Sequence, residues 1–183
     1  MSDRPFVVVT MVLGLLRLIE LRISRRNERQ LELTGRPGAA ASTFPVMAAL
    51  HVALFTLPLF EIHRARPRRL LGGAMLLLAV ILRWWCIRTL GRQWNVRAAT
   101  PQSFSVIGGG PYRFVRHPNY LAVALEFLAL PLFGGAWKTG AVLSAANSLV
   151  LWQRVVTEEA VLNRQPEYLR LMGHKPRFIP GLG

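Results

Sequence analysis

Five apolar stretches dominate this sequence, and each is close to the roughly 20 residues that a helix needs to cross the hydrocarbon of a bilayer. They are Phe6–Ile23, Phe44–Ile62, Leu70–Leu90, Asn119–Trp137 and Thr139–Val156. The last two are separated only by a short corner, so they are predicted to form an antiparallel helical hairpin. The chain is therefore expected to be an all-α polytopic membrane protein with about five transmembrane helices. No repeat or long linker divides it, so residues 1–183 are expected to form one domain.

Composition agrees with a membrane protein that has basic flanks. The chain is 52% hydrophobic, yet Lys and Arg outnumber Asp and Glu by 23 to 9. The basic residues lie between the apolar stretches rather than along one face of a polar domain, which argues against nucleic acid as a partner. The single cysteine, Cys86, excludes an intrachain disulfide and a thiolate-cluster metal site, and no metal is expected.

The distribution of Lys and Arg predicts the orientation. With five spans, fifteen of these residues fall on one side, in segments 22–36, 88–116 and 154–177. Six fall on the other side, at Arg4, in segment 64–69 and at Lys138. The positive-inside rule therefore favours an N-terminus outside and a C-terminus in the cytoplasm.

The segment 108–120, Gly-Gly-Gly-Pro-Tyr-Arg-Phe-Val-Arg-His-Pro-Asn-Tyr, places polar and charged groups between two apolar stretches. Its glycines can take backbone angles that are closed to other residues. Pro118 disfavours helical geometry at His117 and suits the first position of the following helix. A cation (Arg116), an imidazole and a phenol (Tyr120) are therefore expected at a helix N-terminus, where an anionic group binds favourably.

Several motifs together resemble those of the isoprenylcysteine carboxyl methyltransferase family of multi-span membrane methyltransferases. The matching elements follow the family order: Leu-Gly-Arg-Gln-Trp (90–94), segment 110–120, Glu158-Glu159, Tyr168 and Pro-Arg-Phe-Ile-Pro (176–180). They cover roughly the C-terminal half. The chain departs from many members at Ala122, where the family often has glycine, and this methyl group is expected to narrow the cofactor site or to mark a subfamily.

The resemblance implies S-adenosylmethionine as the methyl donor, bound within residues 88–183 at the cytoplasmic ends of the last two spans and covered by the C-terminal tail. Arg116 is expected to pair with the donor carboxylate, and Glu158 or Glu159 to accept hydrogen bonds from its ribose or ammonium. Arg116, Glu158 and Glu159 are also the catalytic candidates. The full set of residues expected to bind the cofactor is Tyr112, Arg116, His117, Pro118, Tyr120, Glu158, Glu159 and Phe178.

Structural interpretations compete with these assignments. Arg116 also suits an interfacial cation that faces lipid phosphate. Glu158 lies four residues after Arg154, the spacing of an ordinary helical ion pair, whereas Glu159 has no such neighbour, which makes it the better functional candidate. The pair Arg17 and Glu20, three residues apart, is expected to neutralise itself on one helical face. His51 and Asn147 suit either an interior wall or interhelical packing, and Glu126 is expected to face protein. The tryptophans at 84, 85 and 94 are interpreted as interface anchors.

The acceptor is expected to be lipophilic and to enter from the membrane. The N-terminal half looks closer to small bacterial-type members that O-methylate long-chain alkylpyrones or alkylresorcinols than to prenylcysteine methyltransferases, which implies a bacterial cell membrane. Carboxyl methylation of a prenylated cysteine is the alternative. Other classes are an NADPH-dependent membrane reductase, suggested by Arg-His-Pro-Asn-Tyr (116–120), and a non-catalytic membrane protein. A phenolic acceptor would need a base among His117, Glu158 and Glu159.

Overall fold

The computed structural model describes residues 3–30, 41–61, 67–97 and 105–179. The described chain is all-helical, as predicted, with short 3₁₀ turns between the main helices. Its α-helices are α1 (Arg4–Gln30), α2 (Phe44–Thr56), α3 (Arg69–Leu90), α4 (Pro118–Gly134), α5 (Trp137–Leu162) and α6 (Pro166–Met172). Most of the segment 31–43, whose order the sequence leaves open, lies outside the described residues.

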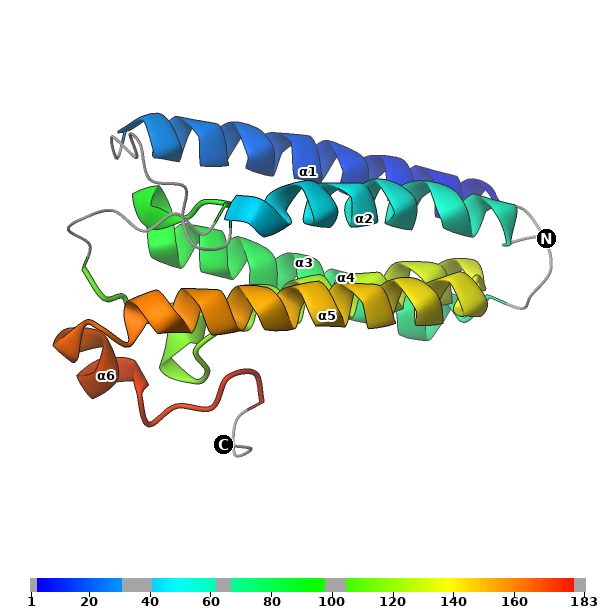
Figure 1. The fold of residues 1–183 in the computed structure, drawn as a ribbon. Coiled ribbons are helices and arrows are strands. Elements are labelled where there is room, and N and C mark those ends of the chain that lie inside the picture. Colours follow the sequence, from blue (N-terminus) through cyan, green and yellow to red (C-terminus); the bar gives the residue numbers. More distant parts are fainter. Residues whose placement is uncertain (1–2, 31–40, 62–66, 98–104, 180–183) are drawn as a thin grey trace.

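The five long helices run side by side along one axis, and α6 and the tail lie at one end (Figure 1). The start of α1 and the α4–α5 corner lie at the opposite end. At that corner Gly135 adopts a left-handed conformation with φ 87°, which turns the chain between the two helices. The predicted antiparallel hairpin is therefore present as α4 and α5.

Small residues let α4 pack closely against its neighbours at the end of the bundle that holds the α4–α5 corner. A Cβ atom at Gly72 of α3 would lie 2.5 Å from the backbone nitrogen of Phe133, and one at Gly140 of α5 would lie 2.8 Å from Cβ of Pro131. Phe127 and Leu130 of α4 are completely buried. The glycine contacts therefore hold the C-terminal end of α4 closely against the first turns of α3 and α5.

Charged side chains lie inside the bundle, between α1, α3 and α4. Glu20 accepts from Arg17 on its own helix and from Nε of Arg83 at 2.8 Å. Arg17 also reaches Glu126 of α4, with an Nη2 to Oε2 distance of 3.1 Å. The predicted pairing of Arg17 with Glu20 is confirmed, and it is half of a neutral cluster of four charges that joins three helices.

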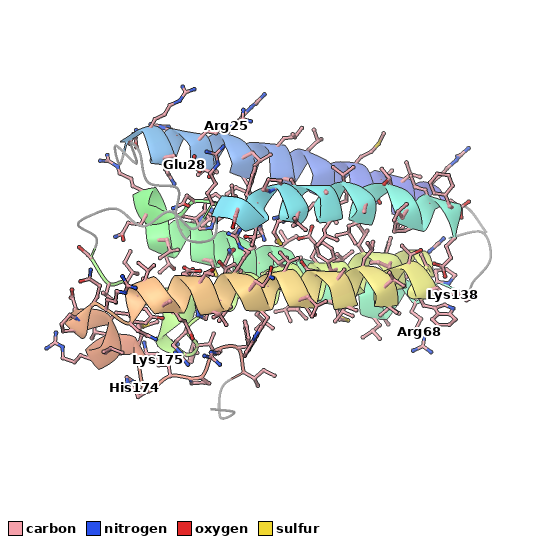
Figure 2. All side chains as sticks on the ribbon, in the orientation of Figure 1. Arg25, Glu28, Arg68, Lys138, His174 and Lys175 are labelled. Atoms are coloured by element: carbon pink, nitrogen blue, oxygen red, sulfur yellow. The ribbon has the colours of Figure 1, made fainter. Side chains whose placement is uncertain are left out.

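Large apolar side chains cover the outside of the same helices. The exposed fraction of Met11 and Leu15 on α1, Leu77 on α3 and Leu149 on α5 is above one half. The labelled charged side chains lie toward the two ends of the bundle (Figure 2). A few buried charges within an apolar core, together with large apolar side chains on the outside, suit a surface that faces lipid.

By length and composition, one helix among the described residues can cross a membrane. It is α3 with its 3₁₀ continuation, Arg69–Gln93, whose mean hydropathy is 2.0. Two further apolar helices, Phe44–Phe60 and Pro118–Gly134, are shorter. The long helices α1 and α5 carry inward-facing charges such as Glu20 and Arg154, which lower their hydropathy.

Glu61 connects the end of the second apolar segment to the start of α5. At Pro58 the α-helix α2 has given way to the 3₁₀ turn Leu57–Phe60, so Glu61 follows directly. Its carboxylate accepts from the backbone N–H groups of Lys138 at 3.0 Å and Thr139 at 2.8 Å, and from the Thr139 hydroxyl at 2.6 Å. Desolvation opposes ionisation, but these hydrogen bonds outweigh it and lower the pKa of Glu61 below its ordinary value.

We predict that Glu61→Ala destabilises the protein by about 1 kcal/mol, because it removes the acceptor at the α5 N-terminus. The loss should be measured as a lower midpoint of thermal unfolding in detergent. A carboxyl with a lowered pKa contributes stability above its ordinary pKa and loses it as pH falls through the lowered value. The difference between the native protein and Glu61→Ala should therefore shrink on acidification, and a constant difference would contradict the assignment.

Candidate functional site

The motif segment begins with a turn that only glycine can make. Gly110 has φ 54°, in the left-handed region, and a Cβ atom there would clash with Oγ1 of Thr89 on α3. Gly109 is extended and needs no special freedom. Pro111 follows in the 3₁₀ turn Gly110–Arg113 and is buried, so the segment is pressed against α3 before it reaches Arg116.

The C-terminal tail pairs with this segment through backbone hydrogen bonds. The N–H of Arg116 donates to the carbonyl of Pro176 at 2.9 Å, and the N–H of His117 donates to the carbonyl of Arg177 at 3.0 Å. Lys175 Nζ donates to the carbonyl of Tyr112 at 2.9 Å. Residues separated by some 60 positions in sequence therefore form one unit at the start of α4.

Glu159 of α5 holds that unit together. Its Oε1 lies 2.9 Å from Nη1 of Arg116 and 3.1 Å from Nε2 of His117, and its Oε2 lies 2.8 Å from Nη2 of Arg177. Glu159 lies beyond the apolar stretch that ends at Val156. Desolvation opposes its ionisation, but the hydrogen bonds from His117 and Arg177 and the neighbouring positive charges lower its pKa to about 2.

We call this arrangement of Arg116, His117, Glu159 and Arg177 the Glu159 clamp. As expected from the sequence, Glu159 has no charged partner on its own helix among the described residues; its partners come from the motif segment and the tail. The clamp joins α5, the start of α4 and the tail by charge-assisted hydrogen bonds, which are stronger than neutral ones.

Glu158, the neighbouring residue, faces a different group. It accepts a hydrogen bond of 2.6 Å from the hydroxyl of Tyr120. The Tyr120 ring stacks on His117 with 5.5 Å between ring centroids, and Phe178 of the tail lies 6.2 Å from the same imidazole. Tyr120 therefore contacts both Glu158 and His117, and the hydroxyl proton of Tyr120 lies between its own oxygen and a Glu158 carboxylate oxygen.

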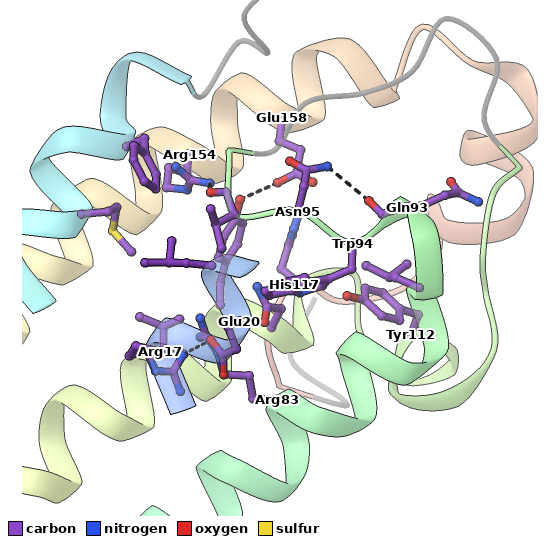
Figure 3. Close-up of a pocket in the computed structure, with 18 of the residues that line it drawn as sticks. Arg17, Glu20, Arg83, Gln93, Trp94, Asn95, Tyr112, His117, Arg154 and Glu158 are labelled. Carbon is purple, nitrogen blue, oxygen red and sulfur yellow. Dashed lines mark hydrogen bonds and ion pairs between the residues drawn. The ribbon is translucent and has the colours of Figure 1, made fainter. Parts of the chain in front are cut away.

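A cavity of about 580 Å³ lies inside the bundle next to these residues. Side chains from α1, α3 and α5 point into it together with those of the motif segment (Figure 3). At the end nearest α6 its wall includes Tyr112, Arg116, His117, Tyr120, Glu158, Leu162, Tyr168 and Met172. This volume lies in the range of small-molecule sites, and the polar groups converge at one end of it.

Five of the predicted cofactor residues line the cavity: Tyr112, Arg116, His117, Tyr120 and Glu158. Three others, Pro118, Glu159 and Phe178, are not among the lining residues and lie behind that wall. Glu159 holds Arg116 and His117, and Phe178 contacts His117. Ala122 is completely buried and is also absent from the wall, so its methyl group does not narrow the cavity.

Other lining residues were missed by the sequence reasoning or given another role. Trp94, interpreted as an interface anchor, is 2% exposed and lines the cavity, so that interpretation is wrong. Tyr168 lines the wall, and its buried hydroxyl has no hydrogen-bond partner among the described residues. Desolvation, followed by the charges of Glu158 and Glu159, raises the pKa of Tyr168. Trp94 and Tyr168 both belong to the family motifs found in the sequence, and this membership was the signal that could have placed them at the site.

The interior charges reach the same cavity from the other side. Arg17, Glu20 and Arg83 line it, as does His51, whose Nδ1 lies 2.7 Å from the carbonyl of Met47. Arg154 of α5 lines it too and donates to the carbonyl of Val96 at 2.8 Å. His51 and the Arg17–Glu20 pair therefore belong to an interior wall rather than to packing alone.

Beyond these charges the cavity continues between α1 and α2. Its wall there includes Leu18, whose exposed fraction is 56%, and Val52, whose exposed fraction is 63%. Side chains that line a cavity and are also largely exposed mark an opening. The cavity therefore opens sideways between two helices whose outer faces are apolar, and we call this part the α1–α2 arm.

Comparisons with known proteins identify relatives of this chain. Residues 72–164 match the Isoprenylcysteine carboxyl methyltransferase (ICMT) family. The chain is 29% identical to the uncharacterized protein YpbQ of Bacillus subtilis over 86% of its own length and 96% of that protein. It is 26% identical to an uncharacterized protein of Haemophilus influenzae over 81% of its length and 89% of that protein.

We predict that Glu159→Gln releases the tail from the motif segment, because two arginines lose their neutralising charge. Amide hydrogen exchange at Arg116 and His117 should become roughly 10- to 100-fold faster, the equivalent of losing a charge-assisted contact. Glu158→Gln is the matched control, since it changes the adjacent glutamate outside the clamp and should leave these amides protected. Equal exchange in both variants would contradict the clamp.

Proposed function

The chain belongs to the isoprenylcysteine carboxyl methyltransferase family, whose members are membrane methyltransferases, and from this membership we propose that it transfers a methyl group from S-adenosylmethionine to an oxygen of a lipophilic acceptor. The observation that carries the proposal is one continuous cavity. The family motif residues line its polar end, and its other end opens between apolar helix faces.

The polar end has groups that fit the donor. Arg116 uses Nη1 for Glu159, and its buried Nε has no partner among the described residues, so the guanidinium retains donors for a carboxylate. The unpartnered Tyr168 hydroxyl and the carboxylate of Glu158 suit an ammonium or ribose hydroxyls. Leu162 and Met172 supply apolar wall for an adenine ring. We propose that Glu159, His117 and Phe178 orient these groups and that Pro118 fixes the start of α4.

When bound, S-adenosylmethionine supplies a methyl carbon that is already activated by its sulfonium. Catalysis by this chain is therefore proposed to consist mainly of positioning and exclusion of water. Arg116 is held by Glu159 and so needs little reorganisation to bind the donor carboxylate. We propose that the tail covers this end of the cavity, which its backbone hydrogen bonds to residues 116 and 117 support.

A hydroxyl acceptor adds the need for a base. The acceptor oxygen forms a bond to the methyl carbon as the carbon–sulfur bond breaks, and the hydroxyl proton leaves to a base. Glu158 suits this role better than Glu159, because Glu158 lines the cavity and Glu159 is committed to three cationic partners. We propose that Tyr120, which is hydrogen-bonded to Glu158, carries the proton from the acceptor hydroxyl to the Glu158 carboxylate.

We propose a long-chain alkylpyrone or alkylresorcinol as the acceptor, with carboxyl methylation of a prenylated cysteine as the alternative. We further propose that α1 to α5 all span the membrane, that residues 1–183 act as one domain, and that the donor site faces the cytoplasm of a bacterial cell. The N-terminus of α1 and the helix α6 lie at opposite ends of the bundle, which supports their placement on opposite sides of the membrane. The apolar exteriors of α1 and α5 support their burial in lipid despite their interior charges.

We predict that Arg116→Ala weakens binding of S-adenosylhomocysteine by about 1.5–3 kcal/mol, the free energy of a charge-assisted hydrogen bond. Calorimetry with purified protein measures this, and NADPH in the same assay tests the reductase alternative. Arg177→Ala is the matched control, because Arg177 also pairs with Glu159 but does not line the cavity. Equal losses in the two variants would assign Arg116 to the clamp alone, and binding of NADPH without S-adenosylhomocysteine would overturn the function.

We predict methyl transfer from labelled donor to a long-chain alkylresorcinol rather than to a farnesylated cysteine analogue. A phenol has an ordinary pKa of about 10 and must lose its proton by the transition state, whereas a carboxyl group, with an ordinary pKa of about 4, has already lost it at neutral pH. Glu158→Gln should therefore slow transfer to the resorcinol by about 10²-fold even at saturating donor. Exclusive methylation of the prenylcysteine would refute this acceptor, and a loss rescued by excess donor would limit Glu158 to donor binding.

A further inference from the structure

The α1–α2 arm is built from the facing sides of two helices over several turns. Its α1 residues recur at helical spacing, and so do its α2 residues, so each helix turns one stripe toward the other. The residues that line the cavity are Gly14, Arg17, Leu18, Glu20 and Leu21 on α1, and Phe44, Met47, Ala48, His51, Val52 and Phe55 on α2. Arg17, Glu20 and His51 lie partway along these two stripes, and the other residues are apolar.

Gly14 is the unusual residue in these stripes. It lies in the middle of α1, where glycine weakens a helix relative to alanine. A Cβ atom there would meet nothing within 4 Å, and its backbone is not left-handed. Gly72 and Gly140, by contrast, allow two helices to approach closely. Neither close packing nor backbone conformation explains Gly14, and the space in front of it belongs to the cavity.

We propose that the α1–α2 arm holds the hydrocarbon chain of the acceptor and that Gly14 determines specificity by keeping the arm open to that chain. The inference rests on the proposed methyl transfer. The arm is continuous with the cavity at the motif residues, so a head group near Glu158 and Tyr120 places an attached chain along Gly14 and Leu18. The hydrocarbon chain then leaves the protein between Leu18 and Val52, two lining residues whose side chains are largely exposed.

The residues that line the α1–α2 arm indicate which class of acceptor it can hold. A single unbranched hydrocarbon chain can pass along one glycine between two helices, where Leu18, Val52 and Phe55 supply apolar wall. The polar groups at Glu158 and Tyr120 favour an oxygen-bearing head at the donor end of the cavity. We therefore expect selection for acceptors with one long chain on a small oxygenated ring, and weak discrimination at the distal end of the chain, which lies in lipid.

The test places a phenylalanine in the arm. Gly14→Phe should slow methyl transfer to a long-chain alkylresorcinol by about tenfold or more, while transfer to the methyl-substituted resorcinol is retained. Leu15→Phe is the matched control, because Leu15 is the adjacent α1 residue, is 61% exposed and does not line the cavity. Ala48→Phe fills the same arm from α2 and serves if Gly14→Phe does not fold. Equal effects on the two acceptors, or no effect in either filled variant, would overturn the proposal.

A second measurement does not depend on turnover. A long-chain alkylresorcinol with a photoreactive diazirine at mid-chain should label peptides of α1 and α2 in the native protein, and Gly14→Phe should reduce that labelling. Binding of S-adenosylhomocysteine should remain unchanged in the filled variants. Labelling of the arm without methyl transfer would refute the proposed function but keep the chain site, whereas methyl transfer with labelling elsewhere would refute the chain site alone.

Discussion

The candidate site depends first on one carboxylate, that of Glu159. It lies on α5, but the groups it binds belong to the motif segment and to the tail, so it fixes the relative positions of three parts of the chain. Despite desolvation by burial, the hydrogen bonds from His117 and Arg177 lower its pKa to about 2, which favours the ionised carboxylate that both arginines need. Such a clamp suits a site in which Arg116 and His117 are already oriented when a ligand arrives.

The bundle has an apolar core with a few buried charges, and large apolar side chains on its outside. Of the interior cluster of Arg17, Glu20, Arg83 and Glu126, the first three line the cavity together with the motif residues and the apolar residues of the α1–α2 arm. One molecule with an oxygenated head and a hydrocarbon chain matches both regions at once. The same cluster holds α1 in place, although much of the apolar surface of α1 is exposed.

Hydropathy predicted the positions of the helices well, and their contacts poorly. The stretch Leu70–Leu90 agrees with α3 to within one residue, whereas α1 continues to Gln30, seven residues beyond the predicted end. That extension is polar, and tertiary contacts hold it: Asn27 donates to the carbonyls of Gly91 and Trp94, at 3.0 and 2.7 Å. The motif residues identified one end of the cavity. The clamp and the α1–α2 arm join residues distant in sequence, and no local pattern records such pairings.

On the proposed topology, in which α1 to α5 all span the membrane, the interior cluster also has a consequence for how the chain enters the membrane. Arg17 and Glu20 form their pair within α1, so this helix can be inserted with its charges already compensated. Arg83 and Glu126 lie on later helices, and each finds its partner only when it reaches α1 in the bilayer. The apolar remainder of α3, with mean hydropathy 2.0, offsets the cost of carrying Arg83 alone at first. Release of α1 from the insertion machinery before α3 and α4 arrive would leave those two charges in lipid, so the order of synthesis and the duration of insertion become part of how this fold is specified.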